Sequence, residues 1–165
     1  LLSRGFKVTY IHSDKIEPVP HANNVKYVSS NDLNNEILNN IETVTNIYMT
    51  SAVSDFIPES HTGKLNRKDG EMSIKLSPNI DIIKSIKAKH KDIKVIAFSA
   101  QLDNDLNYEK ITDKNCDFLV INNLKENDFG SDSNKILIID QNNLIFESDN
   151  ENKNIIAKHI INNTF

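Results

Sequence analysis

The residues that could do chemistry are concentrated in one stretch, residues 47–68. A short apolar run is followed there by three small residues, Thr50, Ser51 and Ala52, and then by Asp55. Small side chains at the carboxyl end of a parallel strand let a ligand approach the backbone. A basic cluster comes next, formed by Lys64, Arg67 and Lys68, and cations of this kind attract phosphate groups. The pattern predicts a nucleotide site at a strand end.

Two further strand ends carry residues that we expect at the same edge of the sheet. Phe98 and Gln101 end one apolar run, and Asn122 and Asn123 end another. Each has an ordinary structural explanation when taken singly, since Asp55 could cap a turn, Phe98 could be a core residue and Asn122 a turn residue. Their joint placement at successive strand ends is what favours a binding site.

Two lysines of a predicted helix, Lys110 and Lys114, are four residues apart, so their side chains share one face. Both would then reach one phosphate chain, although a solvated helix face explains the same spacing equally well. Basic residues as a group concentrate between His61 and Lys94, where nine lysines and arginines occur with four acidic residues. In a chain of net charge −4, such a segment is a candidate phosphate site.

The order of the predicted elements indicates an α/β layered fold. Strands are expected at 6–11, 25–28, 46–50, 93–98 and 117–121, and helices at 33–44, after Pro78, at 104–114 and at 152–162. Residues 135–140 and 143–147 flank Gln141 and Asn142 and predict a closing β-hairpin. Residues 72–76 alternate apolar and polar side chains, so we expect them to form a flap or a hairpin with residues 64–67, or a dimer contact.

Length and composition restrict the class of protein further. The 165 residues fit a single domain, and no apolar run approaches the 18 residues that a membrane span needs. The one cysteine, Cys116, fits a reducing cytoplasm, and we expect a buried apolar side chain rather than a nucleophile. A net charge of −4 argues against a dedicated nucleic-acid binder. The five histidines have no metal-ligand spacing, so no zinc site is predicted.

The first residues predict that an N-terminal βα segment of the domain is missing. Residues 1–4 are typical of the last turn of a helix, Gly5 of its stop, and residues 6–11 of a strand. A helix end that leads into a strand is the middle of a βαβ unit. The chain contains no GxGxxG, Walker or GxSxG motif, so a glycine-rich phosphate loop would have to lie in that missing segment.

Six segments, in order, resemble the phosphopantothenate–cysteine ligase family of coenzyme A synthesis. That family shows AAVADY-P, KIKK, NPDI, GFAAET, D-IVAND and GF-SD-N. The corresponding segments here are SAVSDFIP at 51–58, KLNR at 64–67, NIDI at 79–82, AFSAQ at 97–101, DFLVINN at 117–123 and FGSDSN at 129–134. The chain departs from the family pattern at Ile80, Gln101 and Asn123, where the family has proline, glutamate and aspartate, and in KLNR, where it has KIKK.

The resemblance implies a Rossmann-like three-layer α/β fold with a mostly parallel sheet and a C-terminal β-hairpin. It also implies a role for each matching residue. Lys64 would be the catalytic lysine, which also contacts the nucleotide, and Ala52 would lie beside the acyl-nucleotide intermediate. The other residues implied in nucleotide binding are Met49, Thr50, Ser51, Asp55, Ile80, Asp81, Ile82, Ile83, Phe98, Lys110 and Lys114.

The activity that the resemblance implies joins 4′-phosphopantothenate to cysteine through an acyl-nucleotide. CTP is the expected nucleotide, with ATP left open, and Mg²⁺ is expected on the triphosphate, its protein ligands unassigned. No flavin is expected on this domain. We expect a cytoplasmic homodimer, with fusion to or association with a flavin-dependent decarboxylase left open, and no nucleic-acid or membrane partner.

Two rival functions remain open at this point. The first is a non-catalytic nucleotide-binding or dimerisation module of the same fold. The second is a nicotinamide-dependent reductase, which would require a GxGxxG motif outside these residues and gives no reason for Lys64.

Overall fold

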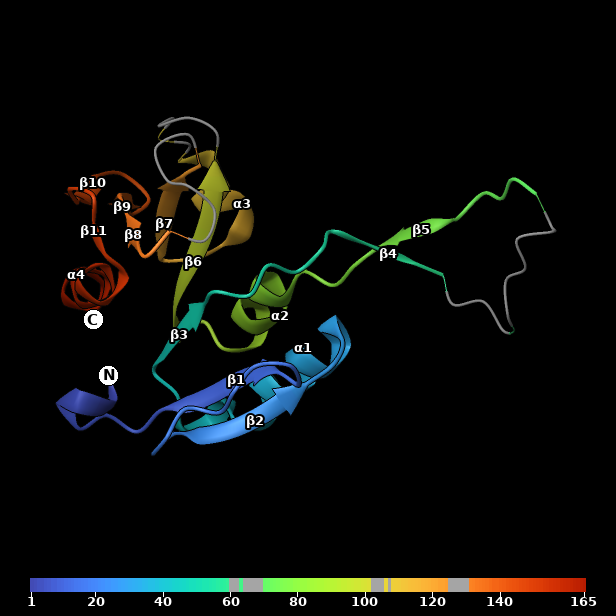
Figure 1. The fold of residues 1–165 in the computed structure, drawn as a ribbon, viewed down its shortest axis with the longest axis horizontal. Helices are drawn as coiled ribbons and strands as arrows, with labels where there is room; N and C mark the ends of the chain where they lie inside the picture. Colours follow the sequence, from blue (N-terminus) through green and yellow to red (C-terminus); the bar gives the residue numbers. More distant parts are fainter. Residues whose placement is uncertain (60–62, 64–69, 102–105, 107, 125–130) are drawn as a thin grey trace.

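A five-stranded sheet forms the centre of the molecule, in the order β10-β9-β7-β6-β3 (Figure 1). The computed structural model describes residues 1–59, 63, 70–101, 106, 108–124 and 131–165. Its parallel strands are β3 (Asn46–Met49), β6 (Lys94–Gln101) and β7 (Phe118–Asn123). β9 (Ile136–Ile139) and β10 (Leu144–Glu147) pair antiparallel as the predicted hairpin. The prediction of a mostly parallel α/β sheet with a C-terminal hairpin is confirmed.

Helices cover both faces of this sheet because β6 is apolar on both sides. Val95 and Ala97 join a core with α1 (Ser30–Asn39), α2 (Ile82–Lys89) and α3 (Glu109–Lys114). Ile96, which points to the opposite face, joins a second core with α4 (Lys153–Thr164). A strand that is buried on both faces needs such an apolar run, and the result is the predicted three-layer arrangement.

A separate pair of parallel strands, β1 (Thr9–Ser13) and β2 (Asn23–Tyr27), lies beside the main sheet (Figure 1). Within the described residues no strand pairing joins the two sheets. The apolar core does join them, since Ile11 and Tyr27 pack against the same cluster as Ile47 and Met49. The chain passes from β2 to β3 through α1 and the short 3₁₀ helix η2 (Ile41–Thr43).

The N-terminal residues form the helix end that the sequence predicts, but the strand begins later than expected. η1 (Leu2–Arg4) is a 3₁₀ turn, and Gly5 ends it with a φ of 83°, a left-handed conformation that suits glycine. The strand expected at 6–11 lies at 9–13. Phe6 instead packs against the ring of Phe165 at the other end of the chain, with 4.5 Å between ring centroids.

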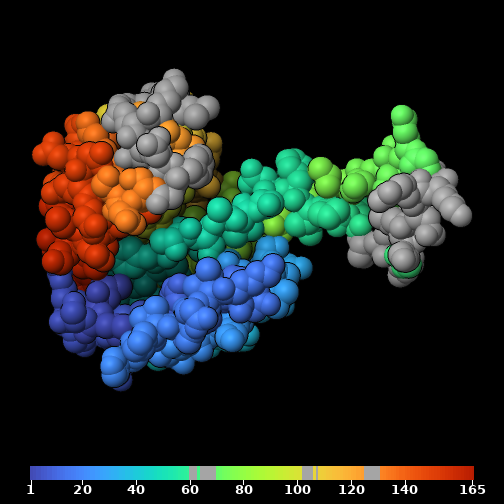
Figure 2. All heavy atoms as spheres, in the orientation of Figure 1, coloured from blue at the N-terminus to red at the C-terminus, as the bar shows by residue number. Residues whose placement is uncertain are grey.

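A two-stranded arm projects from the body of the molecule (Figures 1 and 2). It is formed by β4 (Phe56–Pro58) and β5 (Leu76–Pro78), which pair antiparallel. The predicted strand at 72–76 is therefore wrong in position, and residues 64–67, its expected partner, lie outside the described residues. Hydrogen bonds from Asn79 N to Asp55 O and from Glu59 N to Lys75 O flank the pairing and set its register.

Capping explains why two helices begin where they do. The Ser29 side chain accepts from the backbone of Asp32, whose carboxylate accepts from the backbone of Ser29, so α1 begins at residue 30 rather than at 33. Asp81 caps α2, which therefore begins at Ile82, later than the predicted start after Pro78. The predicted start of α3 at 104 falls outside the described residues. Short strands β8 (Ser133–Asn134) and β11 (Glu151–Asn152) form a further pair.

None of the described helices is long and apolar enough to cross a bilayer.

Candidate functional site

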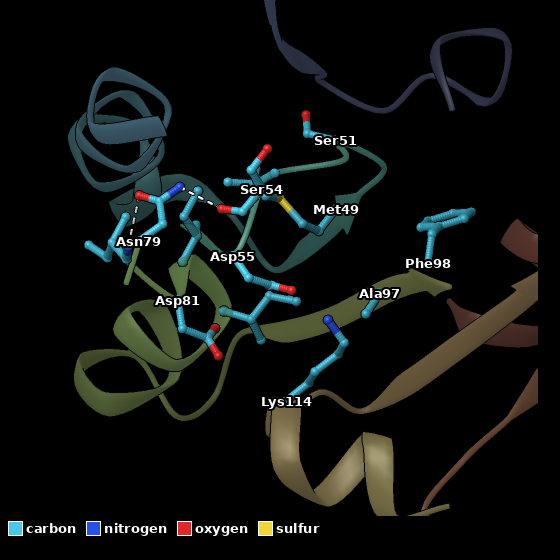
Figure 3. A pocket seen from close by; sticks show the side chains of 13 residues that line it. Met49, Ser51, Ser54, Asp55, Asn79, Asp81, Ala97, Phe98 and Lys114 are labelled. Atoms are coloured by element: carbon cyan, nitrogen blue, oxygen red, sulfur yellow. Dashed lines mark hydrogen bonds between the residues drawn. The ribbon is translucent and has the colours of Figure 1, made fainter. Parts of the chain in front are cut away.

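A hollow lies where β3 ends beside the middle of β6, and we call it the β3 pocket (Figure 3). Met49, the last residue of β3, pairs with Ala97, and β6 continues from there to Gln101. The step between a short strand and a longer neighbour leaves about 630 Å³ of empty space, part of it open to solvent. The carboxyl edge of a parallel sheet is where α/β proteins place their ligands.

Many of the sequence-predicted site residues line this pocket. They come from the end of β3, from the beginning of α2, from β6 and from α3: Met49, Ser51, Asp55, Ile80, Asp81, Ile82, Ile83, Phe98 and Lys114. The structure thus brings these residues together in one pocket. That they bind a nucleotide stays a prediction.

The remaining predicted residues lie elsewhere. Thr50 and Lys110 are not on the wall of the β3 pocket. Ala52 lines a neighbouring hollow, described below. The catalytic assignment of Lys64 falls outside the described residues, as does the rest of its basic cluster.

Four lining residues were not predicted from the sequence: Val53, Ser54, Asn79 and Ala97. Each lies next to a predicted residue in the chain, so the motifs indicate the same segments that line the pocket. Asn79 in particular begins the NIDI segment, directly before four residues that were assigned to the site. The sequence motifs do not show in which direction each side chain points, so these four residues could not be assigned to the site.

Lys114 is the cation on the described part of the pocket wall, and its ammonium group points into the hollow (Figure 3). It lies in the last turn of α3, is half-buried, and makes no salt bridge or hydrogen bond with another described residue. A lysine in this position offers three N–H donors to an anion. The cation that the sequence predicts for a phosphate group is therefore present on the wall.

Two carboxylates, those of Asp81 and Asp55, share the wall with Lys114, and they differ in whether they already accept a hydrogen bond within the protein. Asp81 caps α2 by accepting from the backbone N–H of Lys84 at 3.0 Å, so one of its oxygens is engaged. Because this carboxylate already occupies the positive N-terminal end of α2, the helix dipole attracts a phosphate group less strongly there. Asp55 is exposed, and its side chain makes no hydrogen bond among the described residues. Asp55 is thus the carboxylate that remains available to a ligand.

The described carboxylates fit a magnesium ion carried by a nucleotide better than a resident metal. No group of three or more His, Cys, Asp or Glu side chains gathers in the part of the chain that the structure describes. Mg²⁺ in nucleotide sites is held by one or two carboxylates together with the phosphates and water. Asp55 suits the carboxylate position in such a site.

A second hollow lies on the other side of residues 53–54, and we call it the α1 hollow. It contains about 510 Å³ of empty space, part of it open to solvent, at the N-terminal end of α1. Hydroxyl and small apolar groups line it, among them Tyr27, Ser30 and Ala52. No charged side chain belongs to its described lining. The two hollows therefore differ in charge as well as in position.

The sequence matches one protein-family model over its full length. The match covers residues 1–165 and is to the family described as the DNA/pantothenate metabolism flavoprotein C-terminal domain. The chain belongs to this family.

Relatives with the family domain carry more than one name. A "Coenzyme A biosynthesis bifunctional protein CoaBC" from Borreliella burgdorferi is 34% identical over 164 residues, which is 95% of this chain and 41% of that protein. A "Cysteine/Cysteine sulfinic acid decarboxylase" from an unknown prokaryotic organism is 34% identical over 119 residues, 68% of this chain and 33% of that protein. This chain spans between 28% and 41% of the length of the curated relatives it matches.

A solved structure of the family shares the fold. The crystal structure of the C-terminal domain of CoaBC superposes with a TM-score of 0.77 at 21% sequence identity, covering 98% of this chain and 76% of that one. At this level of identity the likeness concerns the arrangement of strands and helices, which is the Rossmann-like fold that the sequence predicts.

Proposed function

We propose that this chain is the ligase domain that joins 4′-phosphopantothenate to cysteine in coenzyme A biosynthesis. The observation that carries the proposal is the meeting of Lys114 and Asp55 in one pocket at the carboxyl end of β3. Membership of the family and the name of the CoaBC relatives support the pathway. CTP is the nucleotide we propose, with ATP as the alternative in the same site.

The first step forms an acyl-nucleotide. A carboxylate oxygen of 4′-phosphopantothenate attacks the α-phosphorus of the triphosphate, the bond from that phosphorus to the bridging oxygen breaks, and pyrophosphate leaves with the electron pair. Both reactants are anions, so cations are needed more than a general base. Lys114 holds phosphate oxygens from the wall of the β3 pocket, and Lys64 stabilises the charge that develops on the leaving pyrophosphate.

The second step transfers the acyl group. The amine of cysteine attacks the activated acyl carbon, loses a proton to solvent, and the nucleoside monophosphate leaves. Ala52 and the small residues beside it leave room for this intermediate next to the backbone, as the strand-end position requires.

Mg²⁺, when bound, supplies charge neutralisation on the triphosphate, and Asp55 is the described carboxylate suited to contact it.

The proposed setting is a homodimer in the cytoplasm. The names of two relatives, a bifunctional protein and a decarboxylase, support a decarboxylase fused to or associated with this domain. No flavin, nucleic-acid or membrane partner is proposed for the domain itself.

Pyrophosphate release by the full-length protein tests the proposal. The assay contains MgCTP or MgATP in separate reactions, each with and without 4′-phosphopantothenate, and it omits cysteine except in one control reaction, where cysteine replaces 4′-phosphopantothenate. We expect release that requires 4′-phosphopantothenate and is faster with CTP. Release with cysteine replacing 4′-phosphopantothenate, or no release at all, would contradict the ligase.

A non-catalytic nucleotide-binding module is the competing function. The departures from the family pattern at Gln101 and Asn123 favour it, since both are neutral amides where the family has acids. Calorimetric binding of MgCTP without any pyrophosphate release would support this alternative and exclude the ligase.

A further inference from the structure

The β3 pocket and the α1 hollow share one wall, and Asn79 is part of it. Val53, Ser54 and Asn79 line both hollows. Residues 51–55, which we call the strap, cross between them after β3 and before the arm. The position of the strap therefore decides the shape of both hollows, and with it the direction in which Asp55 presents its carboxylate.

The strap has no regular structure of its own to hold it. It belongs to neither a helix nor a strand. Among the described residues, the two hydrogen bonds that tie its backbone to another segment both come from Asn79. The backbone N–H of Asn79 donates to Asp55 O at 2.7 Å, and its side-chain Nδ2 donates to Ser54 O at 2.8 Å (Figure 3).

The other side-chain atom of Asn79 binds the elements on either side. Its Oδ1 accepts from Ser30 Oγ at 2.9 Å, at the beginning of α1, and from the backbone N–H of Ile80 at 2.8 Å, before α2. One amide group thus connects the strap, α1 and the entry to α2. The beginning of α2 gives the strap its fixed reference, and the bond to Ser30 adds a contact with α1.

The amide of Asn79 is the chemical group that this position requires. It must donate to a carbonyl and accept from a hydroxyl and an N–H at once, which a carboxylate and an alkyl group cannot do. A carboxylate at residue 79 would place an acceptor against the Ser54 carbonyl and a further negative charge near Asp55 and Asp81.

We propose that Asn79 is a positioning residue that holds the end of the strap in place and thereby orients Asp55 towards the ligand of the β3 pocket. This inference rests on the proposed function for the identity of that ligand, a magnesium–nucleoside triphosphate. Asn79 acts through the strap, so its replacement changes the affinity for the nucleotide before it changes the chemical step.

The test compares Asn79→Asp with Ser30→Ala in the full-length protein. Asn79→Asp is nearly isosteric and removes the donor to Ser54, whereas Ser30→Ala removes the hydroxyl that donates to Asn79 Oδ1 and leaves both bonds to the strap. Steady-state pyrophosphate release gives KM for CTP and kcat separately. We expect Asn79→Asp to raise KM for CTP at least 10-fold with kcat within about 3-fold, and Ser30→Ala to leave KM within about 2-fold.

Measuring KM and kcat separately distinguishes a positioning effect of Asn79 from a loss of folded protein. A variant that is partly unfolded has fewer active molecules, so its kcat falls while KM stays unchanged. An unchanged KM in Asn79→Asp would overturn the inference. Should that variant not fold, Asn79→Ser, which is neutral but too short to reach Ser54, replaces it with the same expectation.

Exchange of the backbone N–H of residue 79, which donates to Asp55 O in the strap, distinguishes failure of this inference from failure of the proposed function. After correction for the intrinsic rate of each side chain, we expect this N–H to exchange faster in Asn79→Asp, because a looser strap breaks the bond more often, and at an unchanged rate in Ser30→Ala. If the wild-type protein releases no pyrophosphate, the proposed function fails, and exchange alone then decides whether Asn79 holds the strap. Equal exchange of this N–H in wild type and Asn79→Asp overturns the inference in either case.

Discussion

At the scale of single residues, the side chains of the pocket wall determine whether the β3 pocket can bind an anion. Lys114 points into it without a partner among the described residues, while Asp81 is committed to capping α2. The two thus differ although both were predicted as site residues from the same motifs. A residue contributes to binding only if its polar atoms are not already satisfied within the protein.

The prediction for Lys114 concerns nucleotide affinity. Lys114→Gln removes a charge-assisted hydrogen bond to a phosphate group, and we expect the Kd for MgCTP to rise about 10- to 100-fold. Titration calorimetry measures this Kd. Lys89→Gln is the matched control, since Lys89 is an exposed lysine of α2 outside the pocket wall. Equal affinities for the two variants would remove Lys114 from the site.

The prediction for Lys64 concerns turnover rather than binding. Lys64→Gln should lower kcat about 100- to 1,000-fold, a loss of about 3–4 kcal/mol of transition-state stabilisation, on the scale of one oxyanion-hole donor. Single-turnover pyrophosphate release measures the chemical step directly. Lys68→Gln, in the same basic cluster, should have a much smaller effect. Near-normal turnover of Lys64→Gln would refute the catalytic role.

Cys116 provides a prediction on pH. Its thiol is 1% exposed, and burial raises its pKa from 9.0 to about 11. At pH 8 the thiolate fraction is therefore about 100-fold lower than in the unfolded chain, and it remains low until the pH approaches 11. We expect a disulfide reagent to label native protein at least 100-fold more slowly than protein in urea. Comparable rates below pH 9 would contradict the buried position.

At the scale of elements, the arm stands out because it projects from the body (Figure 2), and apolar side chains on it and beside it are exposed. Phe56 and Leu76 are each 56% exposed, and Ile74 is 64% exposed. A two-stranded ribbon is marginally stable by itself in water. Contact with a second copy of the chain would bury these residues, which agrees with the proposed homodimer.

The prediction for the arm concerns the oligomeric state. Replacing Phe56 and Leu76 together with serine should weaken the dimer at least 10-fold, because each buried apolar side chain contributes about 1.5–3 kcal/mol. Sedimentation velocity over a range of concentrations measures the dissociation constant. Ile155→Ser, at an exposed position of α4, is the control. A wild-type protein that sediments as a monomer would contradict the dimer.

At the scale of the whole molecule, a partly buried ion pair connects α2 with the central sheet. Lys87 of α2 contacts Asp117 with 2.6 Å between Nζ and Oδ2, and the Lys87 side chain is 8% exposed whereas that of Asp117 is 38% exposed. The same carboxylate accepts from the backbone N–H of Val95, in β6, at 2.7 Å. Asp117 directly precedes β7, so the pair fixes α2 to the centre of the sheet.

Removing one partner of the Lys87–Asp117 pair should lower the free energy of unfolding. Asp117→Ala leaves the buried ammonium of Lys87 without its counter-charge, and we expect a loss of about 1–3 kcal/mol in the free energy of unfolding, because solvent screens the half-exposed carboxylate. The double variant with Lys87→Met should recover much of that loss. Urea unfolding measures both. Glu59→Ala, which breaks the exposed pair with Lys75, should cost less than about 1 kcal/mol and serves as the control.

The sequence by itself determined the features that depend on local pattern. The two-faced apolar run of β6, the left-handed Gly5 and the closing hairpin follow from side-chain periodicity and turn chemistry, which act within a few residues. The motifs also indicated the strand end at which the β3 pocket lies. Only the tertiary structure decided the pairing of the arm, the separation of β1 and β2 from the main sheet, and the choice of Lys114 over Lys110 for the pocket wall. It also revealed Asn79 as the link between the strap and two helices, because such links join residues far apart in the chain and depend on where each side chain points.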